Sequence, residues 1–283
     1  MATIIYGSEL AMELKEEMKE EVSALAREKR VPCLAVILVG DNPASLSYVT
    51  AKEKACQEIG LTSKPYRLPA TSTQAEVEEV IKKCAKDEEV DGILLQLPLP
   101  KGLNEAQALE CIPAEKDVDG LTTMNVGKFF LGQDSFVPCT PLGIMEILKK
   151  MNCEIDGKRA VVIGRSKLVG TPIARLLQNA GATVTICHSR TKDLPSITKE
   201  ADILVAAVGK PQLFGKEYVK DGAYVIDVGV NRLENGKLCG DMKFDEVEPI
   251  AAAITPVPKG VGPMTICMLL RNTIEAYKKK EGI

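Results

Sequence analysis

Apolar and polar residues follow two different periods along this chain, and the two periods alternate from one end to the other. Apolar side chains spaced three and four residues apart predict amphipathic helices, whereas short runs of β-branched and other apolar residues predict buried strands. Helices are expected at residues 8–30, 43–59, 74–85, 141–151 and 263–279. Strands are expected at residues 33–39, 64–68, 92–97, 203–206 and 224–228. Because strands alternate with helices throughout, the pattern predicts an α/β fold with parallel sheets.

Residues 160–190 form a strand, turn, helix and second strand within this pattern. The apolar run Ala160–Ile163 leads through Gly164 into an amphipathic helix, and a second apolar strand follows at Val184–Cys187. Such a crossover makes the two strands parallel neighbours, and a glycine turn before a helix suits the approach of a pyrophosphate. Neither G-x-G-x-x-G nor G-x-x-x-x-G-K-[ST] is present, because Gly164 and Gly170 are six residues apart and no lysine follows. The unit therefore favours a dinucleotide site, with a plain strand-to-helix turn as the alternative.

The residues after the second strand indicate which dinucleotide would bind. An NAD site normally has an acidic side chain there, whereas a 2′-phosphate requires cationic or hydroxyl groups. Here the strand is followed by His188, Ser189 and Arg190, and the first acid is Asp193. Arg165 adds a second cation in the glycine turn, and arginine matches phosphate geometry. The pattern favours NADP over NAD, unless both arginines are only solvated loop residues.

Composition limits the class of protein. A chain of 283 residues is long enough for two domains. The formal net charge of −3, the lack of tryptophan and the 4% aromatic content give no reason to expect nucleic acid. No apolar run reaches membrane-spanning length and the N-terminus lacks a secretory segment, so we expect a cytoplasmic protein that binds no membrane. The nine cysteines without a C-x-x-C pair indicate buried reduced thiols, and the single His188 argues against a metal site built from histidines.

Lys52 is an unusual residue in the expected helix 43–59. It lies in the middle of the apolar stripe that contains Val49, Cys56 and Ile59. Burial disfavours a charged amine, so such a lysine either extends to the surface or lines a cleft with the lowered pKa of a proton-transferring group. Tyr48 shares this helix face one turn earlier, although core packing is the more common role for a single tyrosine.

Gln96 is the polar side chain in the apolar run of residues 92–97, which Pro98 and Pro100 bring to an end. An amide at the carboxyl end of a buried parallel strand lies where open α/β sheets bind ligands. A satisfied structural glutamine is the alternative. Two loops add candidates: Asp119 precedes a glycine, as in a simple turn, and residues 255–265 contain prolines that would fix the loop's shape.

Six short motifs occur in the order Tyr48-x-x-x-Lys52, Leu95-Gln96-Leu97-Pro98-Leu99-Pro100, Lys116-Asp117-Val118-Asp119-Gly120, Cys139-Thr140-Pro141, Gly164-Arg165-Ser166 and Val257–Thr265. Together they make the chain resemble the bifunctional methylenetetrahydrofolate dehydrogenase/cyclohydrolase family of the FolD type over essentially its whole length. The resemblance implies a folate-binding catalytic domain at residues 1–138, completed by a C-terminal helix at 264–283. It also implies a Rossmann-like NADP domain at 139–263, a cleft between the two domains, and a homodimer.

The resemblance also implies roles for single residues. Lys52 would be the catalytic lysine, Gln96 the partner that tunes its pKa, and Asp119 the group that holds the pterin ring. The other substrate-binding residues would be Tyr48, Leu95, Leu97, Pro258, Gly260 and Gly262. The cofactor-binding residues would be Thr140, Gly164, Arg165, Ser166, Ser189, Arg190 and Val230. One position departs from the family pattern: Lys259 stands where a glycine is usual, and its Cβ and charge would alter the loop backbone or attract the acidic folate tail.

The implied activity has two steps in one-carbon metabolism. NADP-dependent oxidation converts 5,10-methylenetetrahydrofolate to 5,10-methenyltetrahydrofolate, and hydrolysis converts the latter to 10-formyltetrahydrofolate. The alternatives are a dehydrogenase without cyclohydrolase activity, a shikimate-type dehydrogenase of similar architecture, and a non-catalytic dinucleotide-binding regulator. The folate-side motifs argue against the shikimate type. Lys52 and Gln96 argue against loss of hydrolysis, and a regulator would not need a lysine on a buried helix face.

Overall fold

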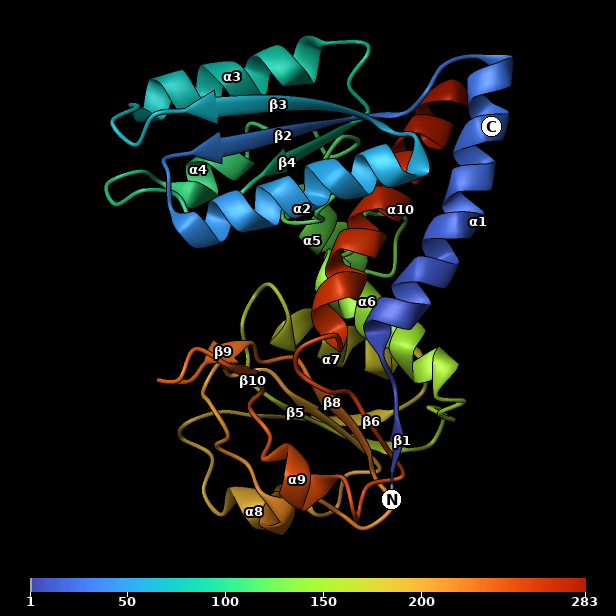
Figure 1. Ribbon diagram of the computed structural model, residues 1–283, viewed down its shortest axis with the longest axis vertical. Coiled ribbons are helices and arrows are strands. Elements are labelled where there is room, and N and C mark those ends of the chain that lie inside the picture. Colours follow the sequence, from blue (N-terminus) through green and yellow to red (C-terminus); the bar gives the residue numbers. More distant parts are fainter. Residues whose placement is uncertain (1) are drawn as a thin grey trace. The chain divides into compact units, whose positions relative to one another are not determined.

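The computed structural model describes residues 2–283, which form two compact units (Figure 1). One unit, here the three-stranded unit, contains Glu13–Cys139 and Ile266–Ile283. The other, here the six-stranded unit, contains the N-terminal residues through Met12 and Thr140–Thr265. The N-terminal residues through Met12 thus belong to the six-stranded unit rather than to the expected N-terminal domain. The reason is that Thr3–Ile4 (β1) pairs with Ala253–Ile254 (β11) of the six-stranded sheet.

The three-stranded unit is built on a parallel sheet in the order β3-β2-β4, with strands Thr62–Leu68, Cys33–Val39 and Gly92–Leu95. Every residue of β2 is buried, as expected for a central strand. The sheet lies between α2 (Pro43–Ile59) and α3 (Gln74–Lys86), as Figure 1 shows. The helices α1 (Gly7–Glu28) and α10 (Val261–Glu281) extend into this unit, and the short helices α4 (Glu105–Leu109) and α5 (Thr123–Phe130) complete it.

Helix α2 begins and ends where its sequence predicts. The side-chain oxygen of Asn42 accepts hydrogen bonds from the N–H groups of Ala44 and Ser45, and Pro43 occupies the first turn. These interactions fix the residue at which the helix begins. They therefore also determine which of its side chains face the sheet. The stripe of Val49, Cys56 and Ile59 is buried against the sheet, which confirms the predicted amphipathic pattern.

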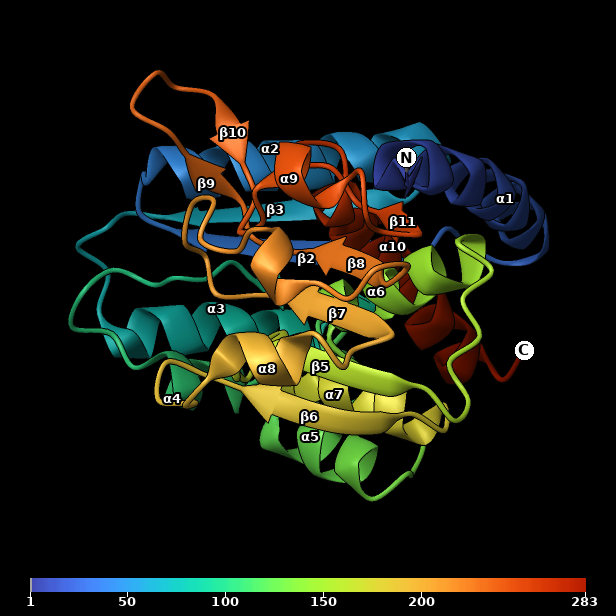
Figure 2. The ribbon, with the colours of Figure 1, turned by 90° about the horizontal axis from the view of Figure 1, so that it is seen from below.

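The six-stranded unit has a parallel sheet in the order β1-β11-β8-β7-β5-β6. Its longer strands are β5 (Arg159–Ile163), β6 (Thr183–Cys187), β7 (Ile203–Ala206) and β8 (Tyr224–Asp227), which lie side by side in Figure 2. Its helices are α6 (Cys139–Lys150), α7 (Gly170–Asn179), α8 (Leu194–Thr198), α9 (Phe244–Val247) and the 3₁₀ turn η1 (Lys216–Tyr218). A short antiparallel pair, β9 (Asn231–Arg232) and β10 (Leu238–Cys239), follows β8.

The order of strands reverses between β5 and β7, because β6 pairs with one side of β5 and β7 with the other. In open parallel sheets, ligands bind beyond the carboxyl ends of the strands at such a reversal. The predicted strand–turn–helix–strand unit is confirmed as β5, α7 and β6. No helix among residues 2–283 has both the length and the apolar character needed to cross a membrane.

Candidate active site

Helix α2 and the end of β4 bring Lys52 and Gln96 into contact. The amine Nζ of Lys52 donates a hydrogen bond to Gln96 Oε1 at 2.8 Å. The amide Nε2 of Gln96 donates to the carbonyl of Leu97, and its backbone N–H donates to Ile37 in the neighbouring strand. The side chain of Gln96 is therefore held at both ends, and it holds the half-buried Lys52 amine inside the protein rather than in solvent.

The carboxylate of Asp119 acts on this amine. Burial lowers the pKa of Lys52, and the nearby charge of Asp119 opposes this effect. Burial also raises the pKa of Asp119, and Lys52 opposes that effect. The buried thiol of Cys139 shares these surroundings, and burial raises its pKa well above the ordinary value. Burial thus favours the neutral form of both the amine and the acid, and a neutral amine can accept a proton.

Two buried charged residues that precede Asp119 fix its loop. Lys116 Nζ donates to the carbonyls of Ala85 and Asp87 at the end of α3, at 2.9 and 2.8 Å. The Asp117 carboxylate accepts from the N–H of Thr122 at 2.9 Å. These two buried side chains support the loop through contacts within the protein. In the sequence they stand out only as part of a motif, because their partners are backbone groups of other segments.

Tyr48 is 52% exposed, so core packing does not account for it. It lies one turn before Lys52 on α2, with its ring available to a ligand. Of the other predicted substrate contacts in this unit, Leu95 is buried in β4 and Leu97 is half-buried just beyond it. The exposed aromatic ring and the buried amine are therefore neighbours along one helix.

In the six-stranded unit, Gly164 ends β5 in the left-handed region with φ +122. A Cβ at this position would overlap the carbonyl oxygen of Ala207, so only glycine fits. The hydroxyl of Ser166 accepts hydrogen bonds from the N–H groups of Val169 and Gly170, at 3.1 and 3.2 Å. The turn is thus tight and has a defined shape, with the backbone close to the sheet edge.

The two candidate phosphate-binding turns lie next to each other. Ile163 pairs with Cys187, so the turn after β5 and the turn after β6 occupy the same edge of the sheet. His188 shapes the second turn, because its Nδ1 accepts from the N–H of Arg190. Five predicted cofactor residues are exposed at this edge of the sheet: Arg165, Ser166, Ser189, Arg190 and, after β8, Val230. Exposed cations and hydroxyls without an acid, beside a tight glycine turn, fit a dinucleotide with a 2′-phosphate.

Thr140 lies at the start of α6, where its hydroxyl is 2.8 Å from that of Thr265. The remaining predicted residues precede Thr265: Pro258 is exposed and Gly260 is buried in the loop before α10, and Gly262 is exposed in the first turn of that helix. Lys259 adopts the left-handed backbone conformation with φ +76, and its carbonyl accepts from the N–H of Ser8 at 3.0 Å. The lysine therefore keeps the backbone conformation that glycine adopts most readily.

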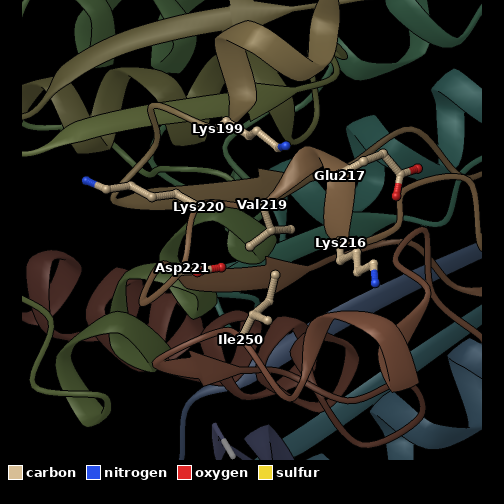
Figure 3. A pocket seen from close by; sticks show the side chains of 7 residues that line it. All are labelled: Lys199, Lys216, Glu217, Val219, Lys220, Asp221 and Ile250. Atoms are coloured by element: carbon tan, nitrogen blue, oxygen red, sulfur yellow. The ribbon is translucent and has the colours of Figure 1, made fainter.

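A hollow of about 680 Å³ lies elsewhere, beside the amino ends of β7 and β8. Its lysines Lys199, Lys216 and Lys220 direct their amines away from one another, as Figure 3 shows. This arrangement is a solvated surface rather than an anion site. Among residues 2–283, no group of three or more histidine, cysteine, aspartate or glutamate side chains is arranged to hold a metal ion.

Comparison with known proteins gives matches over the whole chain. The catalytic-domain model of tetrahydrofolate dehydrogenase/cyclohydrolase matches residues 5–119, and the NAD(P)-binding-domain model of the same family matches residues 138–281. The chain is 54% identical to the bifunctional protein FolD of Anoxybacillus flavithermus over 279 residues, which cover 99% of both chains. The FolD protein of Listeria innocua is also 54% identical over 279 residues, covering 99% of this chain and 98% of the relative.

Solved structures agree with these matches. The FolD methylenetetrahydrofolate dehydrogenase/cyclohydrolase of Campylobacter jejuni has a TM-score of 0.97 at 48% identity and covers 99% of this chain and 100% of its own. The Trypanosoma brucei enzyme, solved with NADP and an inhibitor, has a TM-score of 0.96 at 40% identity and covers 100% of this chain and 99% of its own. Shikimate dehydrogenase of Aquifex aeolicus shares only the fold, with a TM-score of 0.51 at 15% identity over 89% of this chain and 93% of its own.

Proposed function

Because the chain belongs to the tetrahydrofolate dehydrogenase/cyclohydrolase family, we propose that it is the bifunctional enzyme of one-carbon folate metabolism. It oxidises 5,10-methylenetetrahydrofolate with NADP, and it hydrolyses 5,10-methenyltetrahydrofolate to 10-formyltetrahydrofolate. The observation that carries the second activity is the half-buried Lys52 amine, held by Gln96 at 2.8 Å. A non-catalytic binding protein or a dehydrogenase alone would not need that amine.

The six-stranded unit supplies the groups for the cofactor. We propose that Arg165 binds the 2′-phosphate together with the hydroxyls of Ser166 and Ser189, since an arginine and neutral donors replace the usual acid there. Gly164 would admit the pyrophosphate, and Arg190, Val230 and Thr140 would complete the contacts. When bound, NADP accepts the hydride that leaves the carbon between N5 and N10 of the folate.

The three-stranded unit supplies the groups for hydrolysis. Water adds to the cationic carbon of the methenyl compound, the bond from that carbon to N5 breaks, and N5 takes a proton. We propose that neutral Lys52 accepts the proton from the attacking water and returns one to N5, with one proton released overall. Gln96 would orient the amine by accepting its hydrogen bond, so that the neutral nitrogen keeps a lone pair for the proton of water. Asp119 would bind the pterin ring, and Tyr48 would stack against it.

An assay of both activities tests this proposal. The purified chain is given methylenetetrahydrofolate with NADP or with NAD, and in a separate reaction methenyltetrahydrofolate without cofactor. We expect oxidation that is faster with NADP, and hydrolysis in the absence of cofactor. Oxidation without hydrolysis would instead support the monofunctional dehydrogenase. Neither reaction, with NADP still bound, would support the regulator.

We also infer that the enzyme is a cytoplasmic homodimer. Among residues 2–283, the edge strand β6 pairs with β5 alone and leaves Ile186 41% exposed, and such an open edge is a ready site for a second copy. The cysteines lie as buried or half-buried thiols rather than as disulfides, which fits a reducing compartment. Sedimentation analysis should give twice the chain mass of 30.6 kDa, and a single-chain mass would reject the dimer.

A further inference from the structure

Asp241 is completely buried, and its carboxylate joins two loops. Its Oδ2 accepts hydrogen bonds from the N–H groups of Val208 and Gly209, at 2.7 and 3.0 Å. Its Oδ1 accepts from the N–H of Lys210 at 2.8 Å and from the side-chain amide of Asn231 at 3.0 Å. The first three residues follow β7, and Asn231 follows β8. Because β7 and β8 are parallel neighbours, both loops lie at the carboxyl edge of the sheet.

The surrounding backbone has room for this carboxylate only because residue 229 is glycine. A Cβ on Gly229 would overlap Asp241 Oδ1. Gly209 has φ +66, and this left-handed residue helps three successive N–H groups to converge on one anion. A second buried carboxylate holds the backbone in turn: Asp227, at the end of β8, accepts from the N–H groups of Asp241 and Met242, both at 2.9 Å. The loops are therefore fixed by backbone N–H groups that donate to two buried carboxyl groups.

Val230 lies between Gly229 and Asn231, and the Asp241 carboxylate contacts both of these residues. The preceding Gly229 packs against the carboxylate, and the following Asn231 donates to it. Val230 itself is 50% exposed at the edge where parallel sheets bind ligands. An exposed valine on a backbone that is fixed on both sides presents a rigid apolar contact to whatever binds there.

We propose that Asp241 is a positioning residue for NADP, which acts by fixing the backbone of Val230 and of residues 208–210. This inference rests on the proposed function, in which Val230 contacts the cofactor. Asp241 makes its hydrogen bonds within the six-stranded unit, whereas Lys52, Gln96 and Asp119 belong to the three-stranded unit. A change at Asp241 should therefore affect cofactor binding and leave hydrolysis intact.

The test compares full-length Asp241→Asn with the unchanged enzyme. The variant keeps the size of the side chain but places an amide NH₂ against backbone N–H donors. We expect the Kd for NADP, measured by calorimetry, to rise about tenfold or more. The KM for NADP should rise in parallel, while kcat at saturating NADP and the hydrolysis rate stay within about twofold of the unchanged enzyme. An unchanged Kd in a folded variant, or a parallel loss of hydrolysis, would overturn the inference.

Two further variants make the result decisive if Asp241→Asn does not fold. Asn231→Ala removes a single donor to Asp241, and we expect a rise in the Kd of about threefold. Asp202→Asn is the control, because Asp202 accepts from the Arg159 N–H and Lys220 Nζ at the opposite edge of the sheet and should leave the Kd unchanged. An unchanged Kd in Asn231→Ala, or an equal rise in Asp202→Asn, contradicts the inference. If the unchanged enzyme binds no NADP, the proposed function itself fails.

Discussion

Lys52 combines a long apolar stem, a buried helix face and a single strong hydrogen bond to Gln96. Burial lowers the pKa of its amine, so the neutral form is available at a pH where an exposed lysine is fully charged. We expect Lys52→Met to reduce hydrolysis of methenyltetrahydrofolate by about 10²-fold or more, because methionine fills the space but carries no proton. Calorimetry should show unchanged NADP binding.

Lys54 offers a matched control on the same helix. Its side chain is exposed, and its amine lies 3.9 Å from Glu58. Lys54→Met should therefore hydrolyse the methenyl compound at the rate of the unchanged enzyme. If Lys52→Met also retained that rate, the proposed proton transfer would have to be abandoned.

Arg165 is the residue on which the choice of cofactor depends. Its guanidinium is exposed in the turn after β5, beside the turn that holds Ser189 and Arg190. We expect Arg165→Ala to weaken NADP binding about tenfold and NAD binding much less, because only NADP carries the 2′-phosphate. Arg159, at the other end of β5, pairs with Glu200 and serves as the control cation. An equal loss of affinity for both dinucleotides would refute this role.

Lys259 has φ +76, a conformation that costs a residue with a Cβ roughly 1–2 kcal/mol. Replacing it with glycine removes this strain but makes the unfolded chain more flexible, at a cost of roughly 0.4–1 kcal/mol. We therefore expect Lys259→Gly to raise the free energy of unfolding by up to about 1.6 kcal/mol in denaturant titrations. Lys199 has φ −65, so Lys199→Gly should have the opposite sign. Destabilisation in both variants would show that the loop backbone is not strained.

At the scale of elements, long amphipathic helices and fully apolar strands were predictable, whereas the shortest helices and the two-residue strands were not. The prediction of residues 43–59 coincides with α2, and that of 33–39 with β2, because capping residues and full apolar runs mark both ends. Helices α5, α8 and α9 are shorter than the window of about 11 residues over which a helical period can be recognised in a sequence. Strand β1 has only two residues and depends on pairing with β11, which lies near the other end of the chain.

The same distinction holds for the site. Lys52 and Gln96 could be recognised because a polar side chain interrupts an apolar pattern that local sequence makes visible. Asp241 could not, since its partners are backbone N–H groups of loops that only the sheet brings together. In sequence, Gly240 followed by Asp241 reads as an ordinary turn. Residues that bind through their chemistry are therefore easier to predict than those that position others.

Strand β8 ends in Asp227, and the carboxyl group of Asp227 makes the free energy of unfolding depend on pH. Burial raises the pKa of Asp227 from 3.8 to about 7, although the N–H groups of Met242 and Asp241 favour the charged form. The folded state thus holds this proton more tightly than the unfolded state does. Its contribution to stability is present below about pH 4 and is lost as the pH rises to about 7, with a slope of up to about 1.4 kcal/mol per pH unit.

We expect Asp227→Asn to remove this slope from the free energy of unfolding, measured by denaturant titration across that range of pH. Asp202 is the control because its pKa is lowered, and the largest cause is the hydrogen bond from Lys220. The stability that Asp202 contributes is lost only as the pH falls through its lowered pKa, so Asp202→Asn should keep the slope above about pH 4. A slope of the same size in Asp227→Asn would mean that another group binds the proton.

At the scale of the whole molecule, each unit is assembled from segments that are far apart in the sequence. The three-stranded unit needs the C-terminal residues of α10, because Tyr277 is completely buried there and the Arg30 guanidinium lies 4.8 Å from its ring centre. The six-stranded unit needs the first residues for β1. The six-stranded unit therefore joins the N-terminal residues to Thr140–Thr265, and the three-stranded unit is complete only when Ile266–Ile283 have been made.

The reactivity of the nine cysteine thiols toward a reagent shows whether the cores of both units are closed. Within residues 2–283, seven cysteines are buried, and only Cys111 and Cys153 are half-buried. Burial raises the pKa of Cys33 to about 11 and that of Cys56 to about 12. Little of either thiol is therefore in the reactive thiolate form, in addition to being shielded from a reagent. Burial also raises the pKa of Cys153 to about 11. A thiol reagent should therefore modify at most these two half-buried cysteines slowly in the native protein and all nine in denaturant. Rapid native modification of more than two would mean that at least one core opens readily, whereas fewer than nine in denaturant would reveal disulfides.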